Sequence, residues 1–257
     1  MKKEYYAEYR QREDKYWWFQ GRREIFLSLL EQYLPPASEP RQILDVGCGT
    51  GTMLGHLRRF GQAQGVDMDP DAVNFTRERG EKASLALGHE LPFADASFDL
   101  VTALDVIEHI EDVGPALSEI RRVLKDDGIF LCSVPAFMFL WGRQDVISMH
   151  HRRYRRGQLR ATLEEAGFAP IRSTYFNTLL FPPIAAIRLL RRLVPEPEAP
   201  RSDFGTLAFP AANAPLSRAF GMERRVLRFF DLPFGVSILA IARKAEASLG
   251  RVTPLTA

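Results

Sequence analysis

The sequence predicts a doubly wound α/β fold, in which helices cover both faces of a mostly parallel sheet. Strand-like and helical segments alternate regularly from about residue 41 to residue 134. A glycine-rich turn directly follows the first strand-like segment, and the second strand-like segment ends in an acid. Such alternation is typical of parallel strands joined by crossover helices, and the glycine turn predicts a ligand site at the strand ends.

A helix is the first regular element expected, over about residues 21–33. Ile25, Phe26, Leu29 and Leu30 recur there at helical spacing. Two consecutive prolines end this helix, because proline cannot continue the backbone hydrogen bonding. Strands are then expected near residues 41–46, 63–67, 83–87, 98–104 and 128–134, with helices near 51–60, 70–79 and 115–125.

The pattern changes after Val134. An aromatic stretch, PAFMFLW, and a basic stretch, HHRRYRRGQLR, are followed by a helix near 157–166 and a strand near 169–176. Apolar helices then extend to about residue 230, and FGVSILAIAR predicts a final strand over 234–243. We therefore divide the chain into an N-terminal aromatic and helical cap (1–40), a core (41–177), an apolar and basic helical insertion (178–230), and a final strand with a tail (231–257).

The stretch ILDVGCGTG, from Ile43 to Gly51, has the residues of a nucleotide-type cofactor site. Gly47 and Gly49 remove side chains where the backbone must approach a ligand, and the last glycine lets the next helix start close to the strand. Asp67 ends the second strand, where it can accept hydrogen bonds from both hydroxyls of a ribose. The sequence therefore predicts a cofactor-binding enzyme.

Two cofactor classes use this geometry, and the glycine spacing separates them. A dinucleotide site usually reads G-x-G-x-x-G. Its third glycine position is occupied here by Thr52, and the third glycine comes one residue early, at Gly51. This spacing disfavours a nicotinamide-dependent oxidoreductase.

Three strings within residues 40–134 together resemble the class I S-adenosylmethionine-dependent methyltransferases: DVGCGTG, VDMDP and ELPFADASFDLVTALDVIEHI. The resemblance implies a Rossmann-like fold with an antiparallel last strand beside the sheet edge. It also implies S-adenosylmethionine as the cofactor, bound by the core at 41–177. The strings YWWFQGRRE, HHRRY and LPFGVSILAIARK look like a bacterial branch of methyltransferase-domain proteins. That likeness covers nearly the whole chain but supplies no acceptor.

The resemblance implies a role for each residue of the cofactor site. Asp45 and the glycine turn would hold the amino acid end, Asp67 the ribose, and Met68 would pack against the adenine. The family's acid for the adenine amino group is replaced by Leu87, which leaves the backbone at Gly88 for that contact. The implied cofactor-binding residues are Asp45, Gly47, Cys48, Gly49, Gly51, Asp67, Met68, Gly88, Asp105 and Val106, the last two lining the methyl-donor end.

Aromatic and basic residues are the candidates for binding a methyl acceptor. Three aromatic residues, Trp17 to Phe19, precede the first helix, and they either form an acceptor pocket or pack that helix. Arginines of the HHRRY string can bind an anionic acceptor through bidentate hydrogen bonds, or else start the next helix. The candidate acceptor-binding residues are Trp18, Arg22, Arg152, Arg153 and Tyr154.

General base catalysis helps if the acceptor is a hydroxyl, and histidine is suited to it. His109 belongs to the DVIEHI string, where the mouth of the active site is expected, and it either acts as base or fixes the loop after the fourth strand. In the HHRRY string, His151 matches the bacterial branch better than His150 does. The candidate catalytic residues are His109 and His151. No metal site is expected, because Cys48 and Cys132 lie in no metal-ligand spacing.

Charge divides the chain more sharply than hydrophobicity does. Residues 1–134 hold 16 lysines and arginines against 23 acids, a formal net charge of −7, whereas residues 135–257 hold 18 against 9, a net charge of +9. The basic half suits an anionic acceptor or an anionic membrane surface, and a solvated basic face is the alternative. Residues 175–187 are strongly apolar and precede an arginine cluster, which fits an interfacial segment or a buried lid.

The predicted function is an S-adenosylmethionine-dependent methyltransferase with a small or lipid-like, anionic acceptor that is methylated on oxygen. A noncatalytic S-adenosylmethionine-binding partner or regulatory protein is the alternative. Nucleic acid is disfavoured because no nucleic-acid module is recognisable. The sequence has no run of 18 apolar residues and no N-terminal signal-peptide pattern, so a cytoplasmic location is expected, with peripheral membrane contact as an option.

Overall fold

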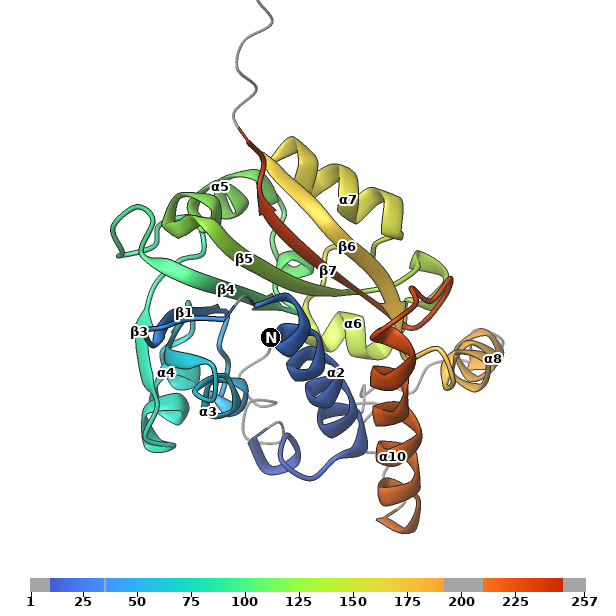
Figure 1. The fold of residues 1–257 in the computed structure, drawn as a ribbon. Helices are drawn as coiled ribbons and strands as arrows, with labels where there is room; N and C mark the ends of the chain where they lie inside the picture. The colour runs from blue at the N-terminus through green and yellow to red at the C-terminus, as the bar shows by residue number, and fades with distance from the viewer. Residues whose placement is uncertain (1–9, 35, 192–209, 247–257) are drawn as a thin grey trace, which may run out of the picture.

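The computed structural model describes residues 10–34, 36–191 and 210–246, in which seven strands form one sheet at the centre of the molecule (Figure 1). The strand order is β3-β2-β1-β4-β5-β7-β6. The strands are β1 (Arg41–Val46), β2 (Gly61–Asp67), β3 (Lys82–Leu85), β4 (Phe98–Leu104), β5 (Leu124–Pro135), β6 (Phe168–Phe176) and β7 (Ser237–Lys244).

Neighbouring strands are parallel except at β7, which is antiparallel to β5 on one side and to β6 on the other. The doubly wound, Rossmann-like fold class with an antiparallel last strand is therefore confirmed. Because β7 runs the opposite way, its first residue, Ser237, pairs with Pro135 at the end of β5 and with Phe176 at the end of β6. The start of β7 thus lies at the same sheet edge as the ends of the parallel strands.

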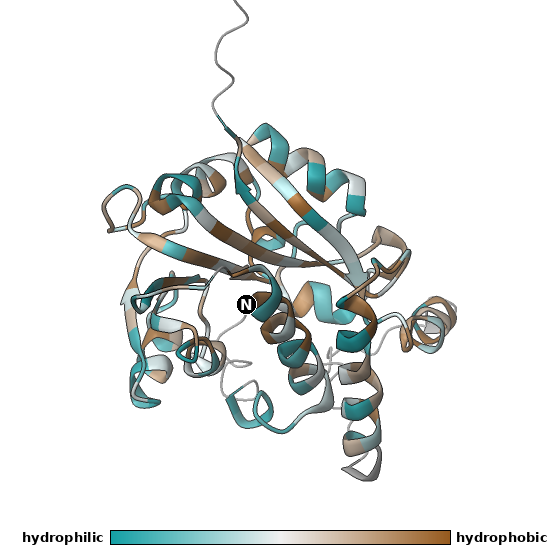
Figure 2. Ribbon diagram, in the orientation of Figure 1, coloured by the Kyte–Doolittle hydropathy of each residue, from teal (hydrophilic) through white to brown (hydrophobic). Residues whose placement is uncertain are grey.

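Helices cover both faces of the sheet. The apolar residues of α5 and α7 pack into one buried cluster, and those of α2, α3 and α10 pack into a second cluster against the other face (Figure 1). Figure 2 shows the apolar strands between these layers and hydrophilic residues on the helices. The helices are α2 (Trp17–Tyr33), α3 (Thr52–Leu57), α4 (Pro70–Glu78), α5 (Val113–Val123), α6 (Arg143–Ser148), α7 (Arg156–Glu165), α8 (Phe181–Arg191) and α10 (Pro210–Leu227), with 3-10 turns η1 (Ile107–His109) and η2 (Met138–Leu140).

Local sequence signals explain where several helices begin. Asp69 is the N-cap of α4, and its side chain accepts a hydrogen bond from the Asp71 amide at 2.8 Å, while Pro70 occupies the first helical position. The Asp112 side chain caps α5 in the same way. These starts agree with the expected helix positions to within two residues.

Two regions differ from the expectation. The aromatic residues Trp17, Trp18 and Phe19 lie inside α2, which begins four residues earlier than predicted because Trp17 and Phe19 are buried against the core. The stretch 175–187 agrees with the strand expected near 169–176, because it begins in β6 and continues in α8 from Phe181. The insertion after β5 contains η2 and α6, which were not expected.

Parts of the proposed division into regions lie outside the described residues, namely 1–9 and 35 of the cap, 192–209 of the insertion and 247–257 of the tail. Within the described residues, no helix is both long and apolar enough to cross a membrane.

Candidate active site

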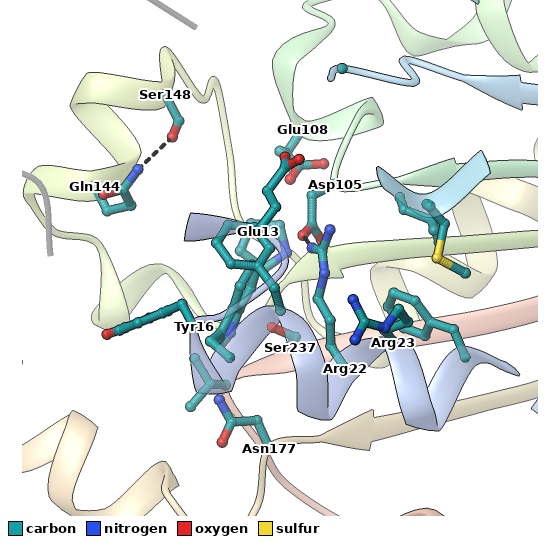
Figure 3. A pocket seen from close by; sticks show the side chains of 18 of the residues that line it. Glu13, Tyr16, Arg22, Arg23, Asp105, Glu108, Gln144, Ser148, Asn177 and Ser237 are labelled. Carbon is teal, nitrogen blue, oxygen red and sulfur yellow. Dashed lines mark hydrogen bonds and ion pairs between the residues drawn. The ribbon is translucent and has the colours of Figure 1, made fainter. Parts of the chain in front are cut away.

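A cavity of about 290 Å³ lies at the sheet edge where the parallel strands end. Its walls come from α2, the turn after β1, η1, α6, α8 and the start of β7. Open α/β sheets bind ligands at this edge, where the connecting loops leave a crevice. Figure 3 shows Arg22 of α2 and Asp105, which follows β4, pointing toward one another inside the cavity.

The glycine turn after β1 has a backbone that favours glycine. Gly47, Gly49 and Gly51 have φ angles of 70°, 56° and 81°. A Cβ atom on Gly47 would lie 2.5 Å from Val106, and one on Gly51 would lie 2.8 Å from Thr76. A Cβ atom on Gly49 would meet nothing within 4 Å, and Gly49 lines the cavity. The outer two glycines therefore allow close packing, whereas the backbone of Gly49 faces space that a ligand can occupy.

Asp45, near the end of β1, is a buried carboxyl group in the cavity wall. The Thr102 hydroxyl donates a hydrogen bond to it at 2.5 Å. Burial raises the pKa of Asp45 to about 7, against the opposing effects of Thr102 and of the Arg22 charge. Cys48 also lines the cavity, and burial raises the pKa of its thiol, so this cysteine stays a neutral, unreactive group.

Asp67 ends β2 beside the glycine turn. It accepts hydrogen bonds from the backbone amides of Gly49 and Asp69, both at 2.9 Å. Burial raises its pKa in spite of these two bonds. The predicted adenine-side residues lie outside the cavity: the side chain of Met68 is 71% exposed, and Gly88 is half-buried away from the lining. Asp67 is buried and is not among the residues that line the cavity either.

Asp105 follows β4 in a left-handed conformation, with φ of 58°. Its carboxylate forms an ion pair with Arg22 and accepts a hydrogen bond from the Ser133 hydroxyl at 2.9 Å. The Arg22 guanidinium lies over the Trp18 ring, 4.4 Å from its centroid. The structure thus brings together Trp18, Arg22 and Asp105, which were predicted separately for the acceptor and cofactor sites. Val106 supports the turn and does not line the cavity.

Glu108 and His109 in η1 and His150 after α6 meet at another wall of the cavity. Glu108 is fully buried, and neither of its carboxylate oxygens has a hydrogen-bond partner among the described residues. Burial raises the pKa of Glu108 well above its usual range, and the nearby charge of Asp105 adds to this effect. The His109 and His150 rings are in edge-to-face contact, with centroids 4.6 Å apart. Burial, together with His150, lowers the pKa of His109 to about 4, so that it is neutral at pH 7.

Asp145 in α6 organises the same wall. It accepts hydrogen bonds from His150 Nδ1 at 2.9 Å and from the Arg153 guanidinium at 2.7 and 3.0 Å. Burial alone would raise the pKa of Asp145. The hydrogen bonds from His150 and Arg153, with the charges of Arg153 and Arg188, lower it instead below its usual range. The buried carboxylate therefore fixes His150 and Arg153 in place.

The HHRRY string contributes fewer residues to the cavity than the sequence suggested. His151 has an exposed side chain outside the cavity, and its amide donates to the Glu108 carbonyl at 2.8 Å. Arg152 donates to backbone carbonyls of the loop after η1, and Tyr154 is buried in the core. Arg153 lines the cavity, and so does His150, which the sequence ranked below His151.

Several residues of the cavity were not singled out from the sequence. The buried Asn177, after β6, has φ of 59°, and neither amide atom of its side chain has a partner in the described part of the chain. Glu13, before α2, accepts hydrogen bonds from the hydroxyls of Thr50 and Thr52, which closes the N-terminal segment over the glycine turn. Glu108 lies in the DVIEHI string beside His109, and that adjacency was the one signal available for it.

The comparisons with known proteins agree with this geometry. Residues 44–132, which contain the glycine turn, Asp67 and Asp105, match the model of a methyltransferase domain family. A probable S-adenosylmethionine-dependent methyltransferase of Mycolicibacterium smegmatis is 34% identical over 163 residues, which are 61% of this chain and 60% of the relative. Residues 44–132 therefore form a methyltransferase domain of the S-adenosylmethionine-dependent kind. S-adenosylmethionine is the cofactor of this domain, as the sequence predicted. The chain spans about three fifths of the length of that relative.

Other relatives of the methyltransferase domain differ in their acceptors. The malonyl-[acyl-carrier protein] O-methyltransferase of Halorhodospira halophila is 36% identical over 114 residues, covering 41% of this chain and 39% of the relative. The solved structure of Haemonchus contortus phosphoethanolamine N-methyltransferase 2 with S-adenosyl-L-methionine has a TM-score of 0.55 and 20% identity, covering 86% of this chain and 52% of that chain. That second likeness concerns the fold alone.

The cavity fits the cofactor on two structural grounds. The Gly49 backbone borders open space, as a turn that receives a ligand requires. The carboxyl groups of Asp45 and Asp105 line the wall that follows β1 and β4, which favours a ligand that carries a positive charge there.

Proposed function

We propose that this protein is an enzyme that transfers the methyl group of S-adenosylmethionine to an oxygen atom of a small or lipid-like acceptor with a negative charge. The observation that carries the proposal is that one cavity joins two unlike walls. Its acidic wall follows β1 and β4, and its apolar and basic wall comes from α2 and α8.

The acidic wall would hold the cofactor, which supplies a methyl group already activated as part of a sulfonium. Asp45 and the Gly47 to Gly49 backbone would bind its amino acid end, and Asp67 would accept hydrogen bonds from its ribose hydroxyls. Asp105 would lie at the methyl-donor end, where Arg22 now pairs with it. These residues act by position, and orienting two bound reactants can supply about 7–11 kcal/mol of the barrier in favourable cases.

The opposite wall supports an acceptor with an apolar body. Trp18 and Phe26 of α2 face this space together with Ile184 and Ile187 of α8. Arginines supply positive charge on the same wall, and burial lowers the pKa of one of them, Arg23. An apolar wall beside cationic groups suits an apolar molecule with an anionic group.

Polar groups near the acceptor space would fix its reacting end. Asn177 offers an amide donor and an amide acceptor that have no partner among the described residues. His109 is neutral at pH 7, so a ring nitrogen can accept a hydrogen bond or bind a cation near the acceptor oxygen, although its low pKa makes it a weak base. His151 lies outside the cavity and has no part in this proposal.

Peripheral contact with an anionic membrane is part of the same proposal. The helix α8 contributes Ile184 and Ile187 to the cavity, while Leu189 and Leu190 at its end are exposed. An exposed apolar helix end next to the cavity would let a lipid-like acceptor pass directly from a membrane to the site.

An acceptor screen tests the function. The purified protein is incubated with S-adenosylmethionine, and release of S-adenosylhomocysteine is measured with apolar carboxylic acids, apolar alcohols that carry an anionic group, and amines of matched length. We expect turnover with the oxygen acceptors and none with the amines. Turnover of amines alone would contradict O-methylation. Tight S-adenosylhomocysteine binding without turnover of any acceptor would favour the alternative, a noncatalytic binding protein.

A further inference from the structure

The strongest unexplained feature of the cavity is the buried carboxylate of Glu108. It is fully buried, and its two oxygens have no hydrogen-bond partner among the described residues. Two arginines of the cavity are already engaged elsewhere, Arg22 with Asp105 and Arg153 with Asp145. A buried carboxylate is costly unless a cation or hydrogen-bond donors compensate it. The site therefore calls for a positively charged or proton-donating partner at Glu108.

Two imidazole rings lie where such a partner would bind. One ligand atom from each of Glu108, His109 and His150 lies within 4.8 Å of the others. His150 Nε2 is 3.9 Å from Glu108 Oε1. All three residues line the cavity, so a cation between them would also be accessible to a ligand in the cavity.

Neighbouring groups contact the His150 and His109 rings. His150 Nδ1 is hydrogen-bonded to Asp145 Oδ1 at 2.9 Å, so the other ring nitrogen, Nε2, is the one that faces Glu108. The backbone of Met149 lies within interaction range of the His109 ring and slightly opposes the lowering of its pKa. A carboxylate or carbonyl behind each histidine is the usual arrangement for metal-binding imidazoles.

We propose that Glu108, His109 and His150 bind one divalent transition-metal ion at the acceptor end of the cavity. Two imidazole nitrogens and one carboxylate suit Zn²⁺, Mn²⁺, Fe²⁺ or Co²⁺ better than Mg²⁺ or Ca²⁺, which prefer oxygen ligands. Three protein ligands leave coordination positions open toward the cavity.

The open positions suit an oxygen atom of the acceptor, and this part of the inference rests on the proposed function. An acceptor hydroxyl or carboxylate bound to the ion would be held beside the methyl-donor end, where Asp105 lies. The ion would also compensate the charge of Glu108. The metal site itself depends on three side chains of this chain and can be tested without any acceptor.

The test uses the full chain after treatment with a chelator and dialysis. Zn²⁺, Mn²⁺ and Co²⁺ are titrated separately by calorimetry, and Co²⁺ is also followed by its visible absorption, which reports the ligand set. We expect one ion per chain. We also expect at least a tenfold loss of affinity in His109→Ala, His150→Ala and the nearly isosteric Glu108→Gln.

The matched control is His151→Ala, because His151 is the neighbour of His150 but its side chain is exposed outside the cavity. It should bind the ion as the wild type does. Thermal unfolding of each variant checks that it is folded, and S-adenosylhomocysteine binding is measured in parallel. No binding of any of the three ions by the folded wild type would overturn the metal site. Equal loss in His151→Ala and His150→Ala would also overturn it.

The two proposals can fail separately. If the wild type binds one ion through these residues but does not bind S-adenosylhomocysteine, the metal site stands and the proposed function fails. If it binds S-adenosylhomocysteine but no ion, the cofactor site stands and the metal site is wrong.

Discussion

At the scale of single residues, the carboxyl groups of Asp45, Asp105 and Glu108 face one cavity and have different partners. Asp105 pairs with Arg22, and Asp45 accepts a hydrogen bond from the Thr102 hydroxyl. Glu108 has no hydrogen-bond partner among the described residues. Because burial disfavours charge, the groups with less compensation have raised pKa values, and a cationic ligand would reverse this effect.

Replacing Asp45 with Asn should remove a pH-dependent loss of stability. The pKa of Asp45 is about 7 in the folded protein, against an ordinary value of 3.8, so the folded state holds the proton more tightly. This contribution to stability is complete below about pH 4 and is lost as the pH rises through 7. We expect Asp45→Asn to be the more stable protein at about pH 8, by on the order of a few kcal/mol.

The measurement is urea unfolding of the ligand-free protein at about pH 5 and pH 8. The wild type should lose more unfolding free energy between these two values than Asp45→Asn does. Equal pH slopes for the two proteins would show that Asp45 is ionised in the folded state at both values.

Replacing Asp67 with Ala tests the ribose contact. A hydrogen bond to a charged group contributes about 1.5–3 kcal/mol, so we expect Asp67→Ala to bind S-adenosylhomocysteine about 10- to 100-fold more weakly by calorimetry. Asp69→Ala is the control, because Asp69 caps α4. Its replacement should lower the free energy of unfolding by about 1 kcal/mol and change the affinity for S-adenosylhomocysteine little. An affinity of Asp67→Ala within twofold of wild type would refute the assignment.

At the scale of elements, the cavity depends on how α2 lies against the sheet and α10. Phe220 of α10 is fully buried, stacks on Phe176 of β6 and meets Trp17 of α2 edge to face. A Cβ atom on Gly21 would lie 2.3 Å from the Phe220 ring. Glycine at this position therefore allows α2, which carries Trp18 and Arg22, to lie close to α10.

Replacing Gly21 with Ala should destabilise the protein although alanine favours helices. The gain in helix propensity is about 1 kcal/mol, and overpacking a filled core costs about 1–3 kcal/mol. We expect a net loss of up to about 2 kcal/mol in denaturant unfolding. Gly157→Ala in α7 is the matched control, because a Cβ atom there meets nothing within 4 Å, and it should be neutral or stabilising. A stabilised Gly21→Ala would mean that the two helices are not packed this closely.

The elements that the sequence predicted well are those with local signals. An apolar alternation, or an Asp-Pro pair such as Asp69-Pro70, is a signal within a few neighbouring residues. Most strands and α4 therefore have bounds close to the predicted ones. The start of α2 could not be read in this way, since Trp17 is helical because of its contacts with Phe220, about 200 residues later. The strand expected near 169–176 ends where β6 ends, whereas no sequence signal indicated a separate start for α8, which begins at Phe181.

At the scale of the whole molecule, acidic and basic parts of the chain meet at one cavity. The glycine turn and the carboxyl groups come from the acidic half, whereas α8 and Arg153 come from the basic half. The exposed residues Leu189 and Leu190 extend the basic side outward as an apolar surface. This arrangement favours an approach to anionic membranes from the α8 side.

Binding to vesicles tests this orientation. We expect the protein to co-sediment with vesicles that contain anionic phosphatidylglycerol, and to bind vesicles of phosphatidylcholine alone more weakly. Leu190→Glu should weaken the binding severalfold, because it puts a negative charge at the proposed contact. The control is Leu85→Glu on β3, which is similarly exposed, at 58% against 62% for Leu190, but lies near the opposite edge of the sheet. Equal effects of the two substitutions would exclude a contact through α8.

The cofactor side of the site was predictable from the sequence, and the acceptor side was not. Asp45 and the glycines follow one another in a single turn, so their spacing alone indicates their place. His150 and His151 are adjacent and chemically identical, and only the position of His150 after α6, beside Asp145, selects it for the cavity. Glu108 and His150 are 42 residues apart and meet through tertiary structure, so cysteine and histidine spacing gave no sign of the proposed metal site.

The position of β7 has a consequence for synthesis. The ribosome makes β5 and β6 before β7, yet β7 lies between them, and it is the strand with which β6 pairs along its length in the described sheet. Until residues 237–244 emerge, a nascent chain carries two unpaired strand edges that invite aggregation. It also lacks the Ser237 wall of the cavity. Chaperones would therefore have to protect these edges during translation, and a chain truncated before β7 would be a target for proteolysis without ever having a complete active site.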